Sequence, residues 1–394
     1  MSEIRDVVIA SAVRTPIGAF QGSISSVPAT ELGSLVIEQA VARANLKPEN
    51  VDEVIMGNVL PAGEGQAPAR QAALGAGLPQ RTETMTINKV CGSGLKAVML
   101  AAQAIRLGDA DIVVAGGTES MSNVPYYMPK AREGYRMGNK EVIDGMIYDG
   151  LWDVYNDFHM GNAAELCARE HGISREEQDS YARMSYERAQ DAQKQGRFMD
   201  EIVPVEVPQR KGDPVTVEED EEPKRARFEK IPELRPAFDK EGTVTAANAS
   251  KINDGASALV VTAAEVAREK GLPVMAKVIG QASAAKAPEW FTTAPIDAIN
   301  KVLDKTGRRM SSVDLFEINE AFSVVNIVAN KQLGISDEKV NVNGGAVALG
   351  HPIGASGARI LTTLLYALRQ RNLKTGLAAL CIGGGEASAL VVER

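Results

Sequence analysis

The sequence predicts an α/β protein built from two related halves, with a separate segment inserted into the first half. Short apolar runs bounded by turn residues, such as residues 7–10 and 112–115, are typical of buried strands in a sheet covered on both faces. These runs alternate with segments whose apolar residues recur at helical spacing. Several motifs also occur twice in the same order, which indicates an internal duplication.

Length, composition and charge agree with this fold class. A chain of 394 residues exceeds one small core, since domains usually contain roughly 100–200 residues. Aromatic residues make up only 5% of the chain, whereas glycine and alanine are plentiful, which suits closely packed sheets and helices. The net charge of −8 argues against a general nucleic-acid-binding protein.

Four pairs of short segments carry the repeat. They are residues 51–56 and 313–318, 91–94 and 354–357, 115–118 and 382–385, and 256–261 and 387–392, the last pair being identical (ASALVV). One such identity between alanine-rich strands can arise by chance, but four pairs in one order favour duplication. In the first half, about 130 residues separate the third and fourth motifs, which are adjacent in the second half. The sequence therefore predicts a first half at 1–119 plus 251–270, an insert at 120–250 and a second half at 271–394.

The predicted helices follow from the spacing of apolar residues and from capping signals. One helix begins after Gly94 and follows a strand at residues 85–87, and another contains the apolar residues of 360–368. In the insert, the segment SREE forms a capping box that opens a charged helix over 174–197. The charge run at 218–225 is predicted to be a solvated loop.

The chain has three cysteines, none spaced as CxxC, which favours a reducing compartment. Residues 1–6 carry early acids and no apolar signal core, and residues 391–394 are not a peroxisomal address. A cytoplasmic location is therefore expected. No apolar run approaches about 18 residues, so no membrane span is expected.

Cys91 is the candidate nucleophile. It lies among glycines in the segment NKVCGSG, where a substrate can approach the backbone closely. The segment joins a strand to a helix, so unpaired amides and the helix dipole are expected to favour the thiolate. A free thiol with a pKa near 8.5 is only a few per cent ionised at pH 7, so a base is needed as well. The alternative is a buried cysteine that acts as a small hydrophobe.

His351 and Cys381 are the candidate acid/base groups. His351, between Gly350 and Pro352 on a loop before a helix, is expected to be exposed and able to accept a proton. Cys381 ends an apolar strand and precedes Gly383, in a glycine turn whose amides can face a developing oxyanion. Standing alone, either side chain is more often structural than catalytic.

Together with Asn319 in the segment NEAF, these motifs resemble the catalytic loops of the thiolase family, and the resemblance extends over nearly the whole chain. It is closest to the biosynthetic, short-chain branch, the acetyl-CoA acetyltransferases. The resemblance implies a five-layered αβαβα fold, in which the insert covers the active site and holds coenzyme A (CoA). It also implies a ping-pong Claisen condensation of two acetyl-CoA molecules to acetoacetyl-CoA and free CoA.

The resemblance implies a role for each motif residue. Cys91 attacks the thioester and carries the acetyl group, while His351 takes the thiol proton. Cys381 removes the α-proton of the second acetyl group. The amides of Cys91 and Gly383 hold the oxygen of the acyl-enzyme, and Asn319 fixes a water that joins His351 in a second oxyanion hole.

The resemblance further implies contacts to CoA and to the acyl group. They are made by Ser250, Ala246, Arg225, Phe238, His159, Met160 and Phe322. CoA is the expected substrate and product, with no separate cofactor and no catalytic metal. Residues 121–138 resemble a tetramerisation loop, so a homotetramer is expected.

Three alternative functions can be distinguished from this one by particular residues. A broader-chain 3-ketoacyl-CoA thiolase of fatty-acid degradation shares the catalytic motifs, but a histidine at His159 is typical of short-chain members. A ketoacyl synthase normally pairs its cysteine with two histidines or with His and Asn, whereas Cys381 occupies the second acid/base position here. The remaining histidine, His171, lies in the insert. A non-enzymatic relative would be expected to lose Cys91, His351 or Cys381, and none is lost.

Overall fold

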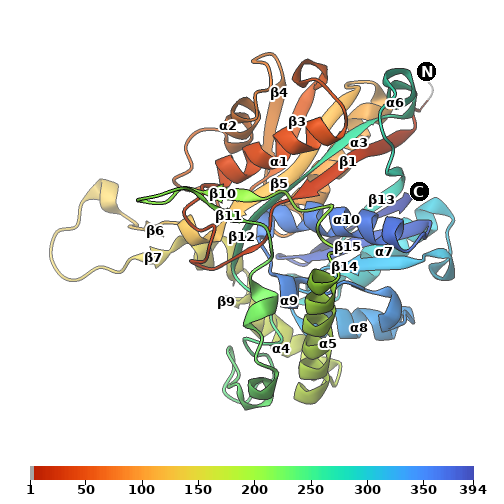
Figure 1. The fold of residues 1–394 in the computed structure, drawn as a ribbon. Coiled ribbons are helices and arrows are strands. Elements are labelled where there is room, and N and C mark those ends of the chain that lie inside the picture. Colours follow the sequence, from red (N-terminus) through yellow and green to blue (C-terminus); the bar gives the residue numbers. More distant parts are fainter. Residues whose placement is uncertain (1–3) are drawn as a thin grey trace.

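A ten-stranded sheet runs through both halves of the chain in the computed structural model, which describes residues 4–394 (Figure 1). Its strands are β1 (Val7–Arg14), β2 (Gly18–Ala19), β3 (Glu53–Gly57), β4 (Glu83–Ile87), β5 (Ile112–Ser120), β12 (Asn253–Ala263), β13 (Ala276–Ala285), β14 (Leu315–Ile318), β15 (Thr375–Ile382) and β16 (Glu386–Glu393). The order is β14-β15-β16-β13-β1-β12-β5-β3-β4, with β2 paired to β12. The predicted strands at residues 7–10 and 112–115 lie within β1 and β5.

The strand order confirms the duplication. In each half, a parallel pair (β3 with β5, β14 with β15) is followed by two antiparallel pairings, and β1 joins β13 where the halves meet. The ASALVV repeat lies in β12 and β16 at matching positions. Asp52 and Asp314 are also equivalent, because each carboxylate accepts two backbone N–H groups at the start of the neighbouring strand.

One predicted repeat pair, 115–118 with 382–385, is wrong. Ala115 lies opposite the leucine of ASALVV in β12, and Ala378 lies opposite the same leucine in β16. The structural equivalent of Thr118 is therefore Cys381. Residues 383–385 instead form the tight turn between β15 and β16, where positive φ values of 88° and 86° at the last two positions favour glycine.

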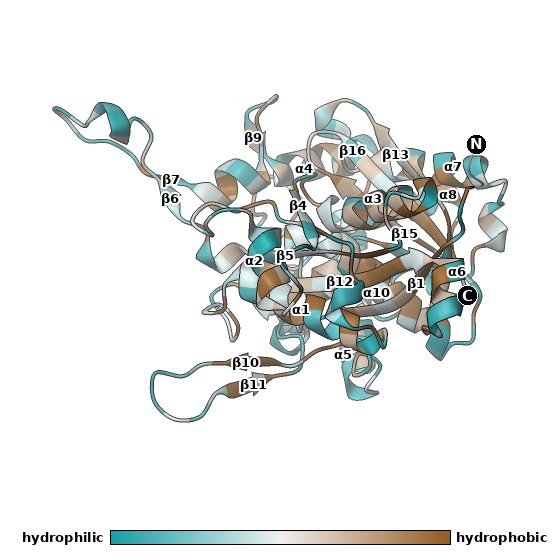
Figure 2. Ribbon diagram, turned by 90° about the horizontal axis from the view of Figure 1, so that it is seen from above, coloured by the Kyte–Doolittle hydropathy of each residue, from teal (hydrophilic) through white to brown (hydrophobic). Residues whose placement is uncertain are grey.

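Five layers result from the way helices cover this sheet. The helices α3 (Ser93–Leu107) and α10 (Ile353–Gln370) contact each other and strands of both halves, so they form the middle layer. The outer helices are α1 (Ala29–Arg43) and α2 (Pro68–Gly75) on the first half, and α7 (Ala294–Thr306) and α8 (Ser323–Leu333) on the second; α6 (Ala264–Lys270) and α9 (Ala346–Leu349) are short connectors. A Cβ on Gly357 would lie 2.3 Å from the backbone nitrogen of Leu95, so the two central helices approach too closely for any side chain there. Apolar residues concentrate on these central elements (Figure 2).

Residues 90–107 meet the length and hydropathy criteria of a membrane-spanning helix, contrary to the expectation that no apolar run approaches that length. They include α3, whose apolar side chains pack against α10 and against strands of both halves of the sheet. Such criteria are also met by core helices, so this is weak evidence for a span. The N-terminal residues Met1, Ser2 and Glu3, part of the stretch that shows no signal core, lie outside the described residues.

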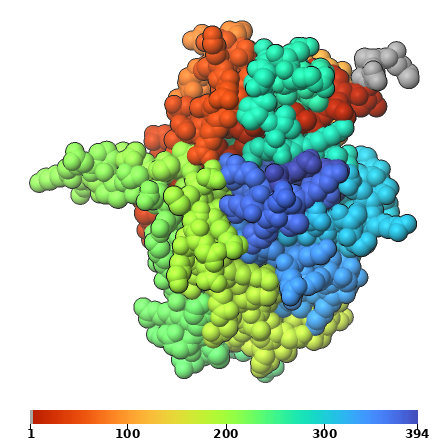
Figure 3. Space-filling model, turned by 45° about the vertical axis from the view of Figure 1, so that its right-hand side comes forward, coloured from red at the N-terminus to blue at the C-terminus, as the bar shows by residue number. Residues whose placement is uncertain are grey.

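The insert packs against both halves (Figure 3). Its helices are α4 (Met160–Glu170) and α5 (Arg175–Lys194), and its hairpins pair β6 (Tyr126–Tyr127) with β7 (Ile143–Asp144), β8 (Trp152–Asp153) with β9 (Phe158–His159), and β10 (Val205–Val207) with β11 (Val215–Val217). The predicted capping box is present, because Ser174 and Glu177 each accept the other's backbone N–H. The helix ends at Lys194, three residues earlier than predicted.

The prediction of a solvated loop at 218–225 is only partly correct, because Asp220 within this charge run is fully buried. Its two carboxylate oxygens lie 2.7 and 2.9 Å from the guanidinium of Arg14 in β1, and Glu201 accepts from the same guanidinium at 2.6 Å. These buried ion pairs join the insert to the central sheet. Removing one partner would leave an uncompensated buried charge, which costs about 3–5 kcal/mol in other proteins.

Candidate active site

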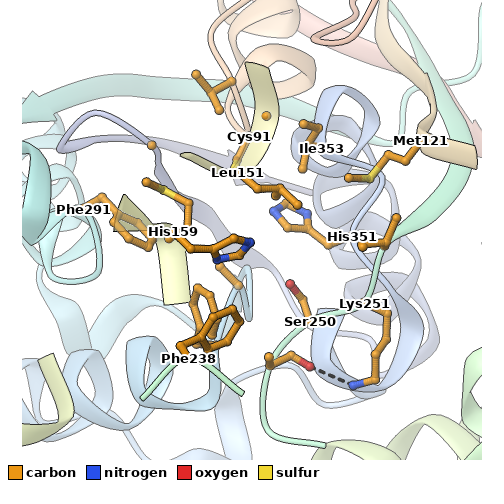
Figure 4. Close-up of a pocket in the computed structure, with 18 residues that line it drawn as sticks. Cys91, Met121, Leu151, His159, Phe238, Ser250, Lys251, Phe291, His351 and Ile353 are labelled. Atoms are coloured by element: carbon orange, nitrogen blue, oxygen red, sulfur yellow. Dashed lines mark hydrogen bonds between the residues drawn. The ribbon is translucent and has the colours of Figure 1, made fainter. Parts of the chain in front are cut away.

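Most of the predicted site residues line one cavity of about 260 Å³ (Figure 4). They are Cys91, His159, Met160, Phe238, Ser250, Phe322, His351 and Gly383. The remaining wall is mainly apolar and comes from Val90, Met121, Gly150, Leu151, Ala249, Lys251, Ile252, Phe291, Ala321 and Ile353. The cavity therefore brings together segments that are up to about 290 residues apart in the sequence.

Cys91 is held at the tip of a strained turn between β4 and α3. Val90 has φ of +44°, a conformation that a β-branched residue rarely adopts. Side chains on both flanks hold it there. Asn88 Oδ1 accepts the Val90 N–H at 2.9 Å, and Ser93 Oγ accepts the Lys89 N–H at 2.8 Å while donating to the Val90 carbonyl at 2.7 Å. Such strain persists where the surroundings fix it, and it is concentrated at functional sites.

The electrostatics of Cys91 differ from the prediction. Burial raises the pKa of its thiol to about 11, although N–H groups of Gly383 and of Cys91 itself stabilise the thiolate and oppose that rise. The nearby carboxyl of Glu119 adds to it. The expectation that the helix end makes Cys91 a thiolate was therefore wrong, because desolvation outweighs the amides. The free site holds a neutral thiol, and nucleophilic attack needs a base.

His351 is fully enclosed, not exposed as predicted, with only 5% of its surface accessible. Its Nδ1 lies 2.6 Å from Ser356 Oγ, which in turn donates to the Pro352 carbonyl at 2.9 Å. With the Ser356 proton on that carbonyl, we assign the imidazole proton to Nδ1 and the lone pair to Nε2. Burial, followed by the charge of Arg359, lowers the pKa of His351 to about 3. The imidazole is therefore neutral and able to accept a proton at Nε2.

Asn319 lies behind His351 at the end of β14. Its Nδ2 is 3.4 Å from His351 Nε2, and its backbone N–H donates to the Ala379 carbonyl at 3.0 Å. Among the described residues, the buried Asn319 Oδ1 has no hydrogen-bond partner. A buried acceptor without a partner fits the predicted water, although Asn319 does not itself line the cavity.

Glu320, the next residue of the NEAF motif, has a structural role. Its buried carboxylate accepts from Tyr181 (3.1 Å), Ser185 (2.7 Å) and Asn341 (2.8 Å), and from the backbone of Val347 (3.1 Å). These bonds join the insert helix α5 to the loop that leads to His351.

Cys381 is completely buried in β15, directly before the turn that brings Gly383 to the cavity surface. Burial, reinforced by the nearby Cys91 sulfur, raises the pKa of Cys381 well above its usual range. Both cysteines are therefore neutral thiols in the free site. Once deprotonated, Cys381 would be a strong base.

The predicted CoA contacts divide between two cavities. His159 stacks on Phe238, with ring centroids 4.7 Å apart, and its Nδ1 accepts the Gly161 N–H at 3.1 Å and so caps α4. Burial lowers the pKa of His159, so it is neutral and offers an Nε2–H. Arg225 and Ala246 do not reach the first cavity, because they line a second one of about 240 Å³.

The second cavity is mostly cationic. Its charged lining residues are Arg225, Arg227, Lys230 and Lys251, with Glu222 as the one carboxylate. The sequence pointed only to Arg225. Arg227 and Lys230 were missed, although they lie in the same basic stretch, and Lys251 was missed although it follows Ser250 directly. Phe291 and Ser356 were also missed, and of these only Ser356, inside the GHPIGASG segment, had a sequence signal.

Among residues 4–394, no group of three His, Cys, Asp or Glu side chains is placed to hold a metal ion. What the geometry offers is thiol chemistry. The thiol of Cys91 and the neutral imidazole of His351 line one apolar cavity, the thiol of Cys381 is buried behind its wall, and a cationic cavity lies next to it.

Comparison with known proteins agrees with this geometry. Residues 7–265 match the family model described as "Thiolase, N-terminal domain", and residues 272–394 match "Thiolase, C-terminal domain". The chain is 57% identical over 390 residues to an acetyl-CoA acetyltransferase of Schizosaccharomyces pombe and 56% identical over 390 residues to one of Cupriavidus necator. These alignments cover 99% of both chains in each case.

Solved structures give the same result. The acetyl-CoA acetyltransferase of Bacillus anthracis superposes with a TM-score of 0.97 at 42% identity, covering 100% of both chains. The Acat5 thiolase of Ascaris suum, solved in complex with coenzyme A, superposes with a TM-score of 0.94 at 46% identity, covering 99% of this chain and 100% of that one. The five-layered fold predicted from the motifs is therefore confirmed, and the chain belongs to the thiolase family.

Proposed function

We propose that the protein is an acetyl-CoA C-acetyltransferase that condenses two acetyl-CoA molecules to acetoacetyl-CoA and CoA, reversibly, through an acetyl group on Cys91. The observation that carries this proposal is the pairing of a strained-turn thiol with an imidazole whose Nε2 is fixed as an acceptor in the same cavity. The printed names of the relatives, acetyl-CoA acetyltransferases at 52–57% identity, support the same activity.

In the first half-reaction, His351 Nε2 takes the Cys91 proton and the sulfur attacks the thioester carbonyl. The N–H groups of Cys91 and Gly383, which already face the sulfur, would hold the developing oxyanion. The leaving CoA sulfur takes the proton of Cys381. The products are acetyl-Cys91, an imidazolium at His351 and a Cys381 thiolate, so protons and charge balance.

In the second half-reaction, the Cys381 thiolate removes an α-proton from a second acetyl-CoA. The enolate oxygen is held by the Nε2–H of the protonated His351 and by a water on the free Asn319 Oδ1. The enolate carbon attacks the acetyl-Cys91 carbonyl, and the Cys91 sulfur leaves with the His351 proton. CoA enters only as substrate and product.

The narrow, aromatic-lined cavity favours a short acyl group over the broader range of a degradative 3-ketoacyl-CoA thiolase. Phe238, Phe322 and Phe291 pack on one another with centroids 6.2 and 6.4 Å apart. A volume of about 260 Å³ is shared between the acyl group and the nearest part of the CoA arm. The second cavity, with its cations, suits the phosphates of CoA.

Acetyl transfer to Cys91 tests the proposal directly. Incubation with acetyl-CoA should add 42 mass units, the acetyl increment, to the peptide that contains Cys91. The Cys91→Ala variant should show no labelled peptide. Labelling at another residue, or none in the wild-type enzyme, would contradict the proposed chemistry.

We also propose a homotetramer. The β6–β7 hairpin exposes apolar side chains, among them Tyr126, Met128 and Met137, and the edge strand β4 exposes Met85. Exposed apolar patches and open strand edges are typical of surfaces that a partner covers. Light scattering coupled to size exclusion tests this, and a monomeric mass would contradict it.

A further inference from the structure

Lys251 is a cation at the active-site wall for which the proposed chemistry has no use. It follows Ser250 directly, on the loop before β12. Its Nζ donates to the Ala249 carbonyl at 2.8 Å and to the Val347 carbonyl at 3.2 Å. Figure 4 shows the side chain pointing away from Cys91, along the wall below His351.

The position of Lys251 relates the two cavities. Of the described residues that line them, only Lys251 lines both the apolar cavity of Cys91 and the cationic cavity of Arg225. A ligand that spans the two cavities must therefore pass this side chain. The acyl end and the phosphate end of a CoA thioester are separated by the pantetheine arm, which carries amide and hydroxyl groups.

The hydrogen-bonding capacity of the Lys251 ammonium is only partly satisfied by the described residues. Two of its three hydrogens reach carbonyls, and its Nζ lies 5.4 Å from the centre of the Tyr186 ring. The carboxylates of Glu222 and Glu320 are near enough to favour the charge, yet within residues 4–394 no carboxylate forms a salt bridge with it. Burial lowers the pKa of Lys251 to about 8, so the side chain stays charged at pH 7.

We propose that Lys251 is a substrate-recognition residue, whose free ammonium hydrogen binds the pantetheine arm beyond its cysteamine unit, at the junction of the two cavities. The inference rests on the proposed function, because it takes a CoA thioester as the ligand. The ammonium of Lys251 is a charged donor beside the path of the polar pantetheine arm. It is suited to bind the arm, because hydrogen bonds to charged groups are stronger than neutral ones. The acyl chemistry itself does not involve Lys251.

The test compares two substrates in two variants. One substrate is acetoacetyl-CoA, and the other is acetoacetyl-N-acetylcysteamine, which lacks the rest of the arm. For Lys251→Met we expect the KM of acetoacetyl-CoA to rise about 10-fold with kcat within about 2-fold, as for the loss of one charged hydrogen bond. With CoA saturating in both assays, the truncated substrate should react unchanged, and Lys251→Arg should restore most of the affinity. Lys331→Met, which removes a surface lysine paired with Glu177, is the matched control and should change neither substrate.

The contrary results are distinct. An equal loss on both substrates would show that Lys251 only positions the loop through Ala249 and Val347, and an unchanged KM for acetoacetyl-CoA would show no role. If the wild-type enzyme does not turn over acetoacetyl-CoA, the proposed function fails. In that case CoA binding by calorimetry still tests Lys251, because Lys251→Met should weaken CoA about 10-fold and equal affinity would overturn the inference.

Discussion

Replacing Ser356 by alanine should disable His351 without touching the substrate cavity. Ser356 Oγ is the acceptor for the Nδ1–H of His351, and it is fully buried and does not line the cavity. In Ser356→Ala the imidazole can exchange to the tautomer that carries its proton on Nε2. That tautomer cannot accept the proton of Cys91.

The expected loss of kcat in Ser356→Ala follows from the buried hydrogen bond of 2.6 Å between His351 Nδ1 and Ser356 Oγ. Leaving a buried donor without its acceptor costs about 1–3 kcal/mol, and this is the energy that now separates the two tautomers. The weak contact of Asn319 Nδ2 with Nε2, at 3.4 Å, replaces little of it. Because each 1.36 kcal/mol is a factor of ten in rate, kcat should fall about 5–150-fold. The KM should change less than about 3-fold, since the ligand does not touch Ser356.

The assay is steady-state thiolysis of acetoacetyl-CoA, with thermal unfolding to verify that the variant is folded. Ser388→Ala is the matched control, because Ser388 is equally buried and, within residues 4–394, its hydroxyl bonds only to Ser283 at 3.0 Å. The control should retain kcat within about 2-fold. A Ser356→Ala enzyme with unchanged kcat would refute the argument that this hydroxyl fixes the tautomer.

Three further predictions concern the cysteines and the aromatic lining of the cavity. Cys381→Ala should lower condensation by about 10²–10⁴-fold yet still form acetyl-Cys91, as judged by mass spectrometry, and full condensation activity would exclude the second thiol as the base. Because burial raises the pKa of Cys91 to about 11, its thiolate fraction grows with pH in this range. Inactivation by iodoacetamide should therefore accelerate about tenfold per pH unit from pH 7 to 9. A plateau below pH 8 would instead indicate a thiolate–imidazolium pair. Phe291→Ala should raise kcat/KM for a six-carbon 3-ketoacyl-CoA relative to acetoacetyl-CoA by about 10-fold, and it should destabilise the fold by about 3–5 kcal/mol. An unchanged ratio of the two kcat/KM values would show that Phe291 does not limit chain length.

Structural features that depend on local sequence patterns and motifs could be predicted from the sequence. The ASALVV repeat and the paired segments around Asp52 and Asp314 led to the duplicated sheet. The capping box at Ser174 led to the start of α5. The division of residues into 1–119 plus 251–270, 120–250 and 271–394 stays a prediction. So do the individual catalytic roles, although most of the residues concerned meet at one cavity.

The sequence failed where burial decides the outcome. A charge run looks solvated, yet Asp220 is enclosed because Arg14, about 200 residues away, compensates its charge. A glycine-flanked histidine looks exposed, but His351 is covered by elements from both halves, and that burial sets its pKa. The thiol of Cys91 likewise follows desolvation more than the helix end. Lys251 went unnoticed because its importance depends on two cavities that only the folded chain forms.

The short-chain acetyltransferase function is tested most directly by the ratio of kcat/KM for thiolysis of acetoacetyl-CoA to that for an eight-carbon 3-ketoacyl-CoA, on the same enzyme preparation. We predict a ratio of at least about 10²-fold in favour of acetoacetyl-CoA, because four more carbons would have to displace the packed aromatic side chains that line the cavity, and overpacking of this kind costs about 1–3 kcal/mol. Comparable or higher efficiency on the eight-carbon substrate would contradict the short-chain assignment and identify a broad-chain degradative thiolase.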